Sequence, residues 1–461
     1  MPWFGLCQTA FAAGTANGAT QNGRIGTQSV NADYRKVDLH FGRPATNSPQ
    51  ASAIHSERDK NSWPIAARYD PGRETNHQRN SMKIVSVSAR NVGVPLAVPT
   101  RIATREIRAR HYLLVSVRTE SGIEGVGYAY SGTVGGDTLV KSVDDIIAPL
   151  IIGEDAHDTS GIWARVYQEG LLAGRRGLLI RALSAVDVAL WDAKAKEVGL
   201  PLATYLGGDV HRPVPAYASG GYYLAGDDNP VTSVIREIEL NREHGFTDHK
   251  IKVGGLPVAE DAARITAAFD VIGNSGRLSI DANNAYRTVP EALAAIRAFE
   301  RAAGDHQIWW YEEALSPDDV AGHADLVRRV DTPIATGEIH QTRWDFRQII
   351  EQRAADILQV DVGVVGGITE YLKVAFTAET FGLPLAPHWH ANVHAQLAAA
   401  STNTMVVEHF LLDKDIYNFE RLLTEETRLR YADGNVVLSD RPGIGIEFDE
   451  EAISSYNERL G

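Results

Sequence analysis

The sequence contains a single cysteine, Cys7, among its 461 residues. One thiol cannot form a disulfide within the chain, and this scarcity fits the reducing cytosol, so we expect a cytoplasmic protein. No apolar run approaches the roughly 18 residues of a membrane-spanning helix. No lysine or arginine precedes Arg24, so the positively charged start that a signal peptide needs is missing as well.

Positive charge is also scarce. The chain carries 45 Lys and Arg residues against 59 Asp and Glu residues, which gives a formal net charge of −14. Phosphate backbones and acidic lipid headgroups do not attract such a surface, so we expect neither a nucleic-acid partner nor a membrane partner. A chain of this length can bury a large core in more than one domain, and its expected partner is a small molecule.

Residues 1–81 lack the apolar periodicity of the rest of the chain. Gly, Asn, Ser, Thr and Gln crowd between Gly14 and Asn47. Such a segment cannot bury enough apolar surface to offset its conformational entropy, which predicts a disordered tail. A strand pattern begins at Met82, so the alternative, which we prefer, is that residues 1–81 are a mis-called upstream start.

Residues 82–210 combine strand and helix patterns. Residues 111–130 alternate around a turn, which predicts a hairpin, and residues 95–104 predict a long loop before it. From residue 143 onward the period becomes helical, with Leu183 and later apolar residues on one face. The pattern predicts an α+β capping domain. Residues 411–461 contain further hairpin-like patterns and are predicted to complete it.

Residues 211–410 repeat one pattern, in which an apolar run ends at a single ionisable residue. Successive ionisable residues are 20 to 31 positions apart, which is the length that one strand, one helix and two short loops require. The pattern predicts a (β/α) barrel of the modified TIM type, whose catalytic groups gather at the carboxyl ends of the strands. The ionisable residues are Lys252, Asp281, Glu312, Glu338, Asp361, His388 and Glu408.

Asp281, Glu312 and Glu338 end three consecutive predicted strands. An acidic donor set made only of oxygen suits a hard divalent cation, and Mg²⁺ keeps positions open for water and a substrate carboxylate. The alternative is that each carboxylate caps the following helix, but three carboxylates in register favour the metal site. Glu313 is expected on the opposite face, because successive side chains of a strand alternate.

Lys250 and Lys252 are expected on one face of their strand, because residues two apart share a face. Buried together near a metal, each ammonium group is expected to lower the pKa of the other, which makes a lysine base near neutral pH. The alternative is a solvated strand face. The position of this strand directly before the Asp281 strand favours the catalytic interpretation.

Asp361 and His388 end two neighbouring predicted strands. A carboxylate that accepts a hydrogen bond from one imidazole nitrogen fixes the tautomer and raises the basicity of the other nitrogen. The alternative is a core histidine without a catalytic role. His340, His390 and His394 add further hydrogen-bonding capacity nearby.

Together these residues place a lysine on one side of a pocket, a His–Asp pair on the other side, and a metal at its floor. This arrangement suits removal of the proton alpha to a carboxylate. The cation and the ammonium groups would neutralise the enediolate, which is otherwise too high in energy to form.

In their order, strand positions and spacing, these residues resemble the mandelate racemase subgroup of the enolase superfamily. The resemblance covers nearly the whole chain from Met82 and includes the capping-domain helix at residues 185–192, AVDVALWD. Two positions depart from the family pattern: Ala314 and Val360 stand where the family commonly has proline. Neither change removes a functional group.

The resemblance implies that one Mg²⁺ per subunit is held by the three carboxylates and that the protein is a homo-oligomer. It implies that Lys252 is a catalytic acid/base with Lys250 as its partner, and that His388 and Asp361 form the opposing dyad. Asn283 would approach the alpha-hydroxyl of the substrate, and Glu408 its carboxylate end.

The same residues support two outcomes. In an acid-sugar dehydratase the enediolate expels the beta-hydroxyl and yields a 2-keto-3-deoxy acid; in a racemase or epimerase the two bases exchange a proton at one carbon. We favour the dehydratase, because Asn283, Asn284, His340 and His390 suit a polyhydroxylated substrate, with His340 and His390 as candidate substrate contacts. A catalytically inactive metal-binding barrel is the third alternative.

Overall fold

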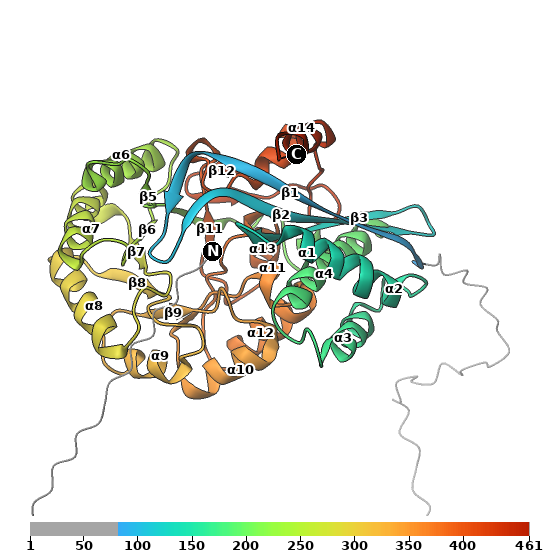
Figure 1. Ribbon diagram of the computed structural model, residues 1–461, viewed down its shortest axis with the longest axis horizontal. Helices are drawn as coiled ribbons and strands as arrows, with labels where there is room; N and C mark the ends of the chain where they lie inside the picture. Colours follow the sequence, from blue (N-terminus) through green and yellow to red (C-terminus); the bar gives the residue numbers. More distant parts are fainter. Residues whose placement is uncertain (1–81, 461) are drawn as a thin grey trace, which may run out of the picture. The chain divides into compact units, whose positions relative to one another are not determined.

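The computed structural model describes residues 82–460 (Figure 1). The predicted tail or upstream start, residues 1–81, lies outside the described residues. The described residues contain a four-stranded antiparallel sheet with helices on it, and a larger, mainly parallel sheet whose strands alternate with helices.

The antiparallel sheet has the strand order β3-β2-β1-β5. The predicted hairpin is confirmed as β2 paired with β3, but the predicted loop at residues 95–104 is wrong, because β1 continues to Arg101. The register of β1 with β2 shifts between Pro95 and Thr100. Proline has no N–H to donate to a ladder, so the strand accommodates it at this irregularity. The strands are β1 (Ile84–Arg101), β2 (Glu106–Thr119), β3 (Glu124–Gly132) and β5 (Tyr223–Leu224).

Helices cover one face of this sheet (Figure 1). The predicted helical segment is confirmed, and the apolar stripe that contains Leu183 and Leu190 on α4 is fully buried. β3 packs closely on α4, because a Cβ at Gly127 would lie only 2.1 Å from the carbonyl oxygen of Ala185. The helices are α1 (Gly136–Ser142), α2 (Ala148–Ile151), α3 (Thr159–Gly170), α4 (Leu178–Glu197) and α5 (Leu202–Tyr205), with a π-helical turn at Val143–Ile147. We call residues 84–205 the N-terminal unit.

The second part of the chain alternates strand and helix as predicted. β4, β6, β7, β8, β9 and β10 pair in parallel in that order, and β11 pairs in parallel with the other side of β4. Single parallel bridges join Leu358 to Leu385 and Leu385 to Thr404. We call residues 214–409 the parallel unit. Its strands are β4 (Val214–Ser219), β6 (His249–Lys252), β7 (Leu278–Asp281), β8 (Ile308–Glu312), β9 (Ile334–Thr336), β10 (Ile357–Leu358) and β11 (Val407–His409).

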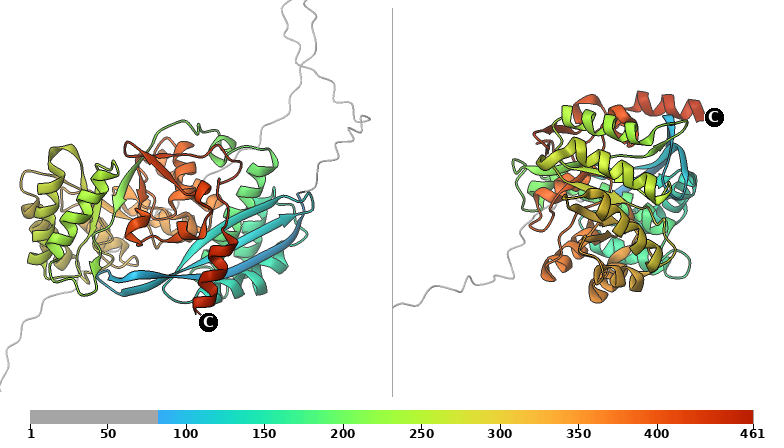
Figure 2. Two further views of the ribbon diagram at one scale, coloured as in Figure 1. Left: turned by 90° about the horizontal axis from the view of Figure 1, so that it is seen from above. Right: turned by 90° about the vertical axis from the view of Figure 1, so that its left-hand side faces the viewer.

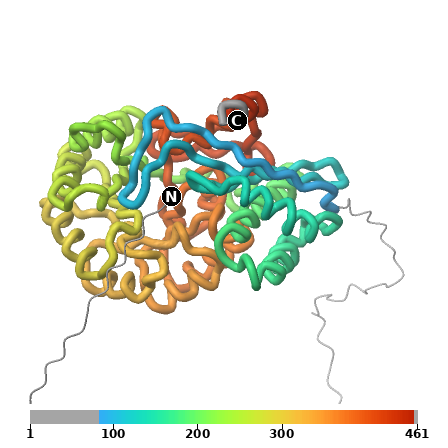
Figure 3. The backbone as a smooth tube through the Cα atoms, in the orientation of Figure 1, coloured from blue at the N-terminus to red at the C-terminus, as the bar shows by residue number. Residues whose placement is uncertain are grey.

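The helices of the parallel unit lie around the outside of its strands (Figure 3). Between helix and strand they bury an apolar layer in which Ile251, Phe269, Ile280 and Phe299 take part. The polar faces of these helices point outward, so this packing leaves the two ends of the strands for polar groups. The helices are α6 (Pro230–Glu243), α7 (Val258–Ile272), α8 (Val289–Ala303), α9 (Val320–Val327), α10 (Thr342–Gln352), α11 (Val362–Val365), α12 (Ile368–Thr380) and α13 (Ala391–Ala399).

The C-terminal segment contacts both parts. The predicted hairpin is confirmed as β12 (Arg430–Ala432) and β13 (Asn435–Val437), and β13 pairs with β4 of the parallel unit. Farther along, Gly443 bridges to Pro201, and α14 (Glu450–Leu460) lies against β1 (Figure 2). The segment therefore ties the two parts of the described chain together. Among helices in residues 82–460, none combines the length and apolarity needed to cross a bilayer.

Asp192 of α4 holds this junction. Its fully buried carboxylate accepts hydrogen bonds from the backbone N–H of Val126 in β3 and of Ile444 in the C-terminal segment, each at 2.7 Å. Asp192→Ala removes the acceptor of both donors and the ion pair with Lys196 at 2.6 Å, so we expect it to lower the free energy of unfolding by about 3 kcal/mol. Urea denaturation measures this. Glu169→Ala, which removes an exposed carboxylate of α3, is the control; an unchanged midpoint for Asp192→Ala would contradict the assignment.

Candidate active site

A cavity of about 180 Å³ lies where the carboxyl ends of the parallel strands face the N-terminal unit. Carboxyl ends of parallel strands bring together residues that are distant in sequence, which is why polar groups from several strands converge here. The parallel unit contributes Lys252, Asn283, Glu338, Asp361 and His388 to its wall, whereas the N-terminal unit contributes Ile102, Arg105, Ile107, Arg110, Tyr130, Ser131, Gly132, Leu178 and Arg181.

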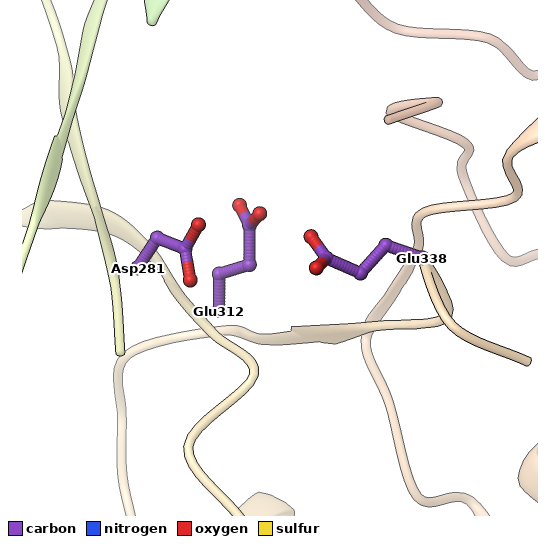
Figure 4. Close-up of side chains that lie close together, drawn as sticks. All are labelled: Asp281, Glu312 and Glu338. Atoms are coloured by element: carbon purple, nitrogen blue, oxygen red, sulfur yellow. The ribbon is translucent and has the colours of Figure 1, made fainter. Parts of the chain in front are cut away.

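Three carboxylates meet at the floor of this region, as the sequence predicts. Asp281 ends β7, Glu312 ends β8, and Glu338 follows β9. Each offers one oxygen atom within 4.8 Å of the others, and Figure 4 shows the three side chains directed toward a common point. Three converging carboxylate oxygens are a suitable donor set for a hard divalent cation.

The electrostatics of the cluster also fit a cation. Burial, and then the neighbouring charges of Asp281, Glu313 and Glu312, raise the pKa of Glu338 to about 8, against an opposing effect of His388. Burial and the Asp281 charge likewise raise the pKa of Glu312. Carboxylates that repel one another in a buried place are stabilised when a divalent cation neutralises them.

Glu313 points away from the cluster, as predicted. Its Oε1 accepts hydrogen bonds from the Thr336 hydroxyl at 2.6 Å and the Gly337 N–H at 3.1 Å, and its Oε2 accepts one from Asn284 at 2.6 Å. Glu313 thereby fixes the loop that follows β9 and carries Glu338.

The two lysines share one face of β6 but have different positions. Lys252 lines the cavity, and its Nζ lies 2.5 Å from Asp281 Oδ2. Lys250 is fully buried beneath it, with Nζ 2.7 Å from Glu312 Oε1 and 2.8 Å from Glu408 Oε1. Only Lys252 therefore lies where it can reach a ligand in the cavity.

The sequence predicted that the two lysines lower each other's pKa, but nearby carboxylates raise the pKa of both. Burial lowers the pKa of Lys252, and Lys250 adds to this effect, but Asp281, Tyr222 and Glu312 together outweigh both and hold the pKa above its usual value. Burial also lowers the pKa of Lys250, yet Glu312 and Glu408 keep it well above normal. The spacing of two residues shows that the lysines are neighbours, but the carboxylates beside them come from distant strands and are found only in the structure.

His388 and Asp361 form the predicted pair. His388 Nδ1 lies 2.8 Å from Asp361 Oδ2, and its Nε2 lies 3.3 Å from Glu338 Oε2. Burial opposes the charge on His388, but Glu338 and Asp361 outweigh it and raise the pKa of the imidazole to about 9. Lys252 and His388 therefore lie at opposite ends of the carboxylate cluster, one beside Asp281 and the other beside Glu338.

Of the four predicted substrate contacts, only Asn283 lines the cavity. Its backbone N–H and its Nδ2 both donate to Asp281, at 2.8 and 3.1 Å, and its buried Oδ1 has no hydrogen-bond partner. Its backbone is left-handed, with φ of 44°, a conformation that asparagine tolerates better than most residues. Asn283 both positions Asp281 and presents a polar group to the cavity.

The other three predicted contacts lie outside this cavity. Glu408 is buried below it, where it holds Lys250 and accepts a hydrogen bond from the Trp389 N–H at 2.7 Å. His390 is fully buried with Nδ1 2.8 Å from Asp361 Oδ1. His340 donates from Nε2 to the Pro317 carbonyl and lines a second cavity of about 150 Å³.

The structure corrects these placements. Glu408 and His390 support Lys250 and Asp361, whereas the loop after β9 turns His340 away from the cavity. His394, also named from the sequence, accepts from the Val362 N–H and donates to the Trp389 carbonyl, so both its ring nitrogens are occupied. His394 is therefore a core histidine with both hydrogen bonds satisfied, whereas Nδ1 of His340 is buried without a hydrogen-bond partner.

Sequence reasoning missed the aromatic and cationic wall of the cavity. Arg110 and Arg181 come from β2 and α4 of the N-terminal unit, and Tyr222 and Trp389 come from the parallel unit. Arg110 stands in the charged series Arg105, Arg108, Arg110, which has the pattern of an exposed strand end. Only the register of β2 shows that Arg110 points inward.

Two family models cover most of the described residues. Residues 84–207 match the N-terminal domain of mandelate racemase and muconate lactonizing enzyme, and residues 233–452 match the enolase C-terminal domain-like family. The chain belongs to the mandelate racemase/muconate lactonizing enzyme family. The resemblance read from the sequence is thereby confirmed.

Members of this family with known activities are similar over most of their length. An L-talarate/galactarate dehydratase of Salmonella typhimurium is 36% identical over 341 residues, which cover 74% of this chain and 81% of that protein. An arabinonate dehydratase of Saccharolobus solfataricus is 33% identical, covering 74% of this chain and 90% of that protein. A D-galactarolactone cycloisomerase of Agrobacterium fabrum is also 33% identical, covering 81% of this chain and 99% of that protein.

A solved structure agrees with these similarities. The L-talarate dehydratase of Polaromonas, in complex with Mg and L-glucarate, superposes with a TM-score of 0.72 at 35% identity, covering 81% of this chain and 97% of that chain. The carboxylate cluster of this chain therefore has the donor chemistry of a family that has been seen with magnesium.

Binding of Mg²⁺ to the cluster can be measured without turnover. We expect calorimetry to show one site, and Glu338→Gln to weaken it about a hundredfold or more, because even changes outside the ligand shell cost 10- to 100-fold. Asp248→Asn, which alters a carboxylate just before β6 at the other end of the strands, is the control. Equal affinity in Glu338→Gln and wild type would refute the site.

Proposed function

We propose that this chain is a Mg²⁺-dependent enzyme that removes the proton alpha to the carboxylate of a sugar acid and then eliminates the beta-hydroxyl. The product would be a 2-keto-3-deoxy sugar acid. The observation that carries this proposal is the row of three carboxylates with Lys252 at one end and His388 at the other.

In this proposal Asp281, Glu312 and Glu338 hold the ion. When bound, Mg²⁺ supplies Lewis-acid stabilisation to the carboxylate of the enediolate. Lys252 lines the cavity, and once a cation offsets the Asp281 charge that raises its pKa, it would take or return the alpha-proton on its side. Lys250 neutralises Glu312 and Glu408 and keeps this buried layer in place.

His388 acts from the other side. Asp361 accepts a hydrogen bond from Nδ1, which leaves Nε2 directed toward Glu338 and the cavity. Nε2 is therefore the atom that would donate a proton to the departing hydroxyl. Because Asp361 also lies against His390 and accepts from the Gly363 N–H, its orientation is fixed from three directions.

Two features support elimination over racemisation. The cavity wall contains Asn283, Ser131 and Tyr130 beside its charged groups, so a polyhydroxylated ligand finds hydrogen-bond partners. The dehydratases of Salmonella and Saccharolobus act on talarate, galactarate or arabinonate, which are sugar acids. The cycloisomerase relative and the two opposed bases keep an isomerase as the alternative.

We also infer that the parallel strands close into a barrel. The parallel pairing order and the bridges through Leu385 support a closed (β/α) barrel of the modified TIM type in residues 211–410. Residues 82–210 and 411–461 would form the capping domain. The homo-oligomeric state and the cytoplasmic location stay predictions.

A panel of sugar acids tests the proposed reaction. With Mg²⁺ we expect formation of 2-keto products, and with EDTA or in Asp281→Asn we expect at least a thousandfold loss, because no other group neutralises the enediolate. A change in optical rotation without formation of a 2-keto product would favour the isomerase. Full turnover in EDTA would contradict the metal-dependent reaction, and tight Mg²⁺ binding without turnover of any acid would favour the inactive barrel.

A further inference from the structure

Arg110 is a buried cation at the cavity wall. Its residue is only 2% exposed, yet it lines the cavity. Its Nη1 donates to the Tyr130 hydroxyl at 3.0 Å and its Nε donates to the Ile416 carbonyl. Its Nη2 is buried and has no hydrogen-bond partner. One side of the guanidinium is therefore anchored to the protein while the other offers free donors.

The hydrogen bonds of Arg110 go to the Tyr130 hydroxyl and the Ile416 carbonyl, and none of the ion pairs among residues 82–456 joins it to a carboxylate. Three aromatic rings surround the guanidinium instead, with Cζ 4.5 Å from the ring centroid of Trp389, 5.4 Å from that of Tyr130 and 5.8 Å from that of Tyr222. Aromatic faces attract a cation weakly but cannot compensate for the lost hydration of a buried charge. The environment of Arg110 is therefore incomplete without an anion.

Arg110 lies near both candidate bases. The ring centroid of Tyr222 is 5.8 Å from Arg110 Cζ and 5.0 Å from Lys252 Nζ. The ring of Trp389 is next to Arg110 on one side and is stacked with His388 on the other, with centroids 5.7 Å apart. One aromatic ring thus separates Arg110 from each base, so a ligand of several carbon atoms can reach from the bases to the guanidinium.

We propose that Arg110 binds a second carboxylate, at the far end of the substrate, and that this enzyme acts on dicarboxylic sugar acids in preference to monocarboxylic ones. A terminal hydroxyl would satisfy the Nη2 donors but would leave the charge unpaired. A carboxylate satisfies both, and its planar pair of oxygens matches a guanidinium. Arg181, whose Nη1 donates to the Tyr130 carbonyl at 2.6 Å, adds positive charge to the same wall.

This inference rests on the proposed function for the position of the first carboxylate, at the metal cluster. The substrate then has one carboxylate near Asp281, Glu312 and Glu338, and the other near Arg110. The parallel unit determines the chemistry at one end, and the N-terminal unit selects the group at the other end. Relatives that act on galactarate and on arabinonate show that the family contains both classes of acid.

Matched pairs of acids test the inference: galactarate with galactonate, glucarate with gluconate, and mannarate with mannonate. The members of a pair differ only in a terminal carboxylate or CH₂OH group. We expect wild-type kcat/KM to be about ten- to a hundredfold higher for the diacid of the best pair, the usual effect of a charge-assisted hydrogen bond. Equal kcat/KM for both members would overturn the proposal.

Variants assign the preference to Arg110. Arg110→Gln should abolish the preference for the diacid, mainly through KM, and Arg110→Lys, which keeps the charge but loses the planar pair of donors, should reduce it. The control is Arg108→Gln on the same strand, whose side chain is 76% exposed and pairs with Glu106, and which should keep the preference. An undiminished preference in folded Arg110→Gln or Arg110→Lys would show that another group binds the second carboxylate.

Binding without turnover separates this inference from the proposed reaction. In Mg²⁺-loaded Lys252→Ala, calorimetry should show tighter binding of the diacid than of its monoacid partner, and Arg110→Lys in this background should reduce the difference. Preferential diacid binding with no turnover by wild type would retain the role of Arg110 and refute the reaction. Turnover of both acids, bound with equal affinity, would support the reaction and refute the role of Arg110.

Discussion

The structure depends on how several carboxylates are buried together at one end of a parallel sheet. Lys250 lies among them, 2.7 Å from Glu312 and 2.8 Å from Glu408, and Lys252 lies 2.5 Å from Asp281. Two lysines do not balance this group, because Glu338 adds a further carboxylate whose pKa burial raises to about 8. A divalent cation completes the balance. The same ion activates the substrate in the proposed reaction, so one electrostatic requirement connects folding with function.

Strand register brings these charges together. Lys252 is the direct neighbour of Asp281 in the pairing of β6 with β7, and Asp281 is the direct neighbour of Glu312 in the pairing of β7 with β8. A shift by one residue would turn these side chains to the opposite face. The apolar residues between strands and helices, such as Ile251 and Ile280, fix this register. The hydrophobic layer therefore determines which charges meet.

Sequence alone predicted the part of the site that follows from strand ends: the three converging carboxylates, the position of Lys252, and the His388–Asp361 contact. It did not predict features that depend on three-dimensional neighbours. The hydrogen-bonding side chain of His340 suggested a substrate contact, but the loop after β9 turns it away from the cavity. Similarly, the inward position of Arg110 results from the register of β2, and the extension of β1 past Pro95 results from pairing that no local pattern shows.

In the proposed reaction Lys252 and His388 act on opposite faces of one alpha-carbon. Alpha-proton exchange in D₂O, followed by NMR with the preferred acid, tests it most directly. For a substrate deprotonated by Lys252, Lys252→Ala should lose both exchange and dehydration by about a hundredfold or more, whereas His388→Asn should lose dehydration and retain exchange. For the epimeric substrate the roles are reversed: His388→Asn should lose both reactions, and Lys252→Ala should retain proton exchange. Undiminished exchange in both variants would show that neither residue is the base.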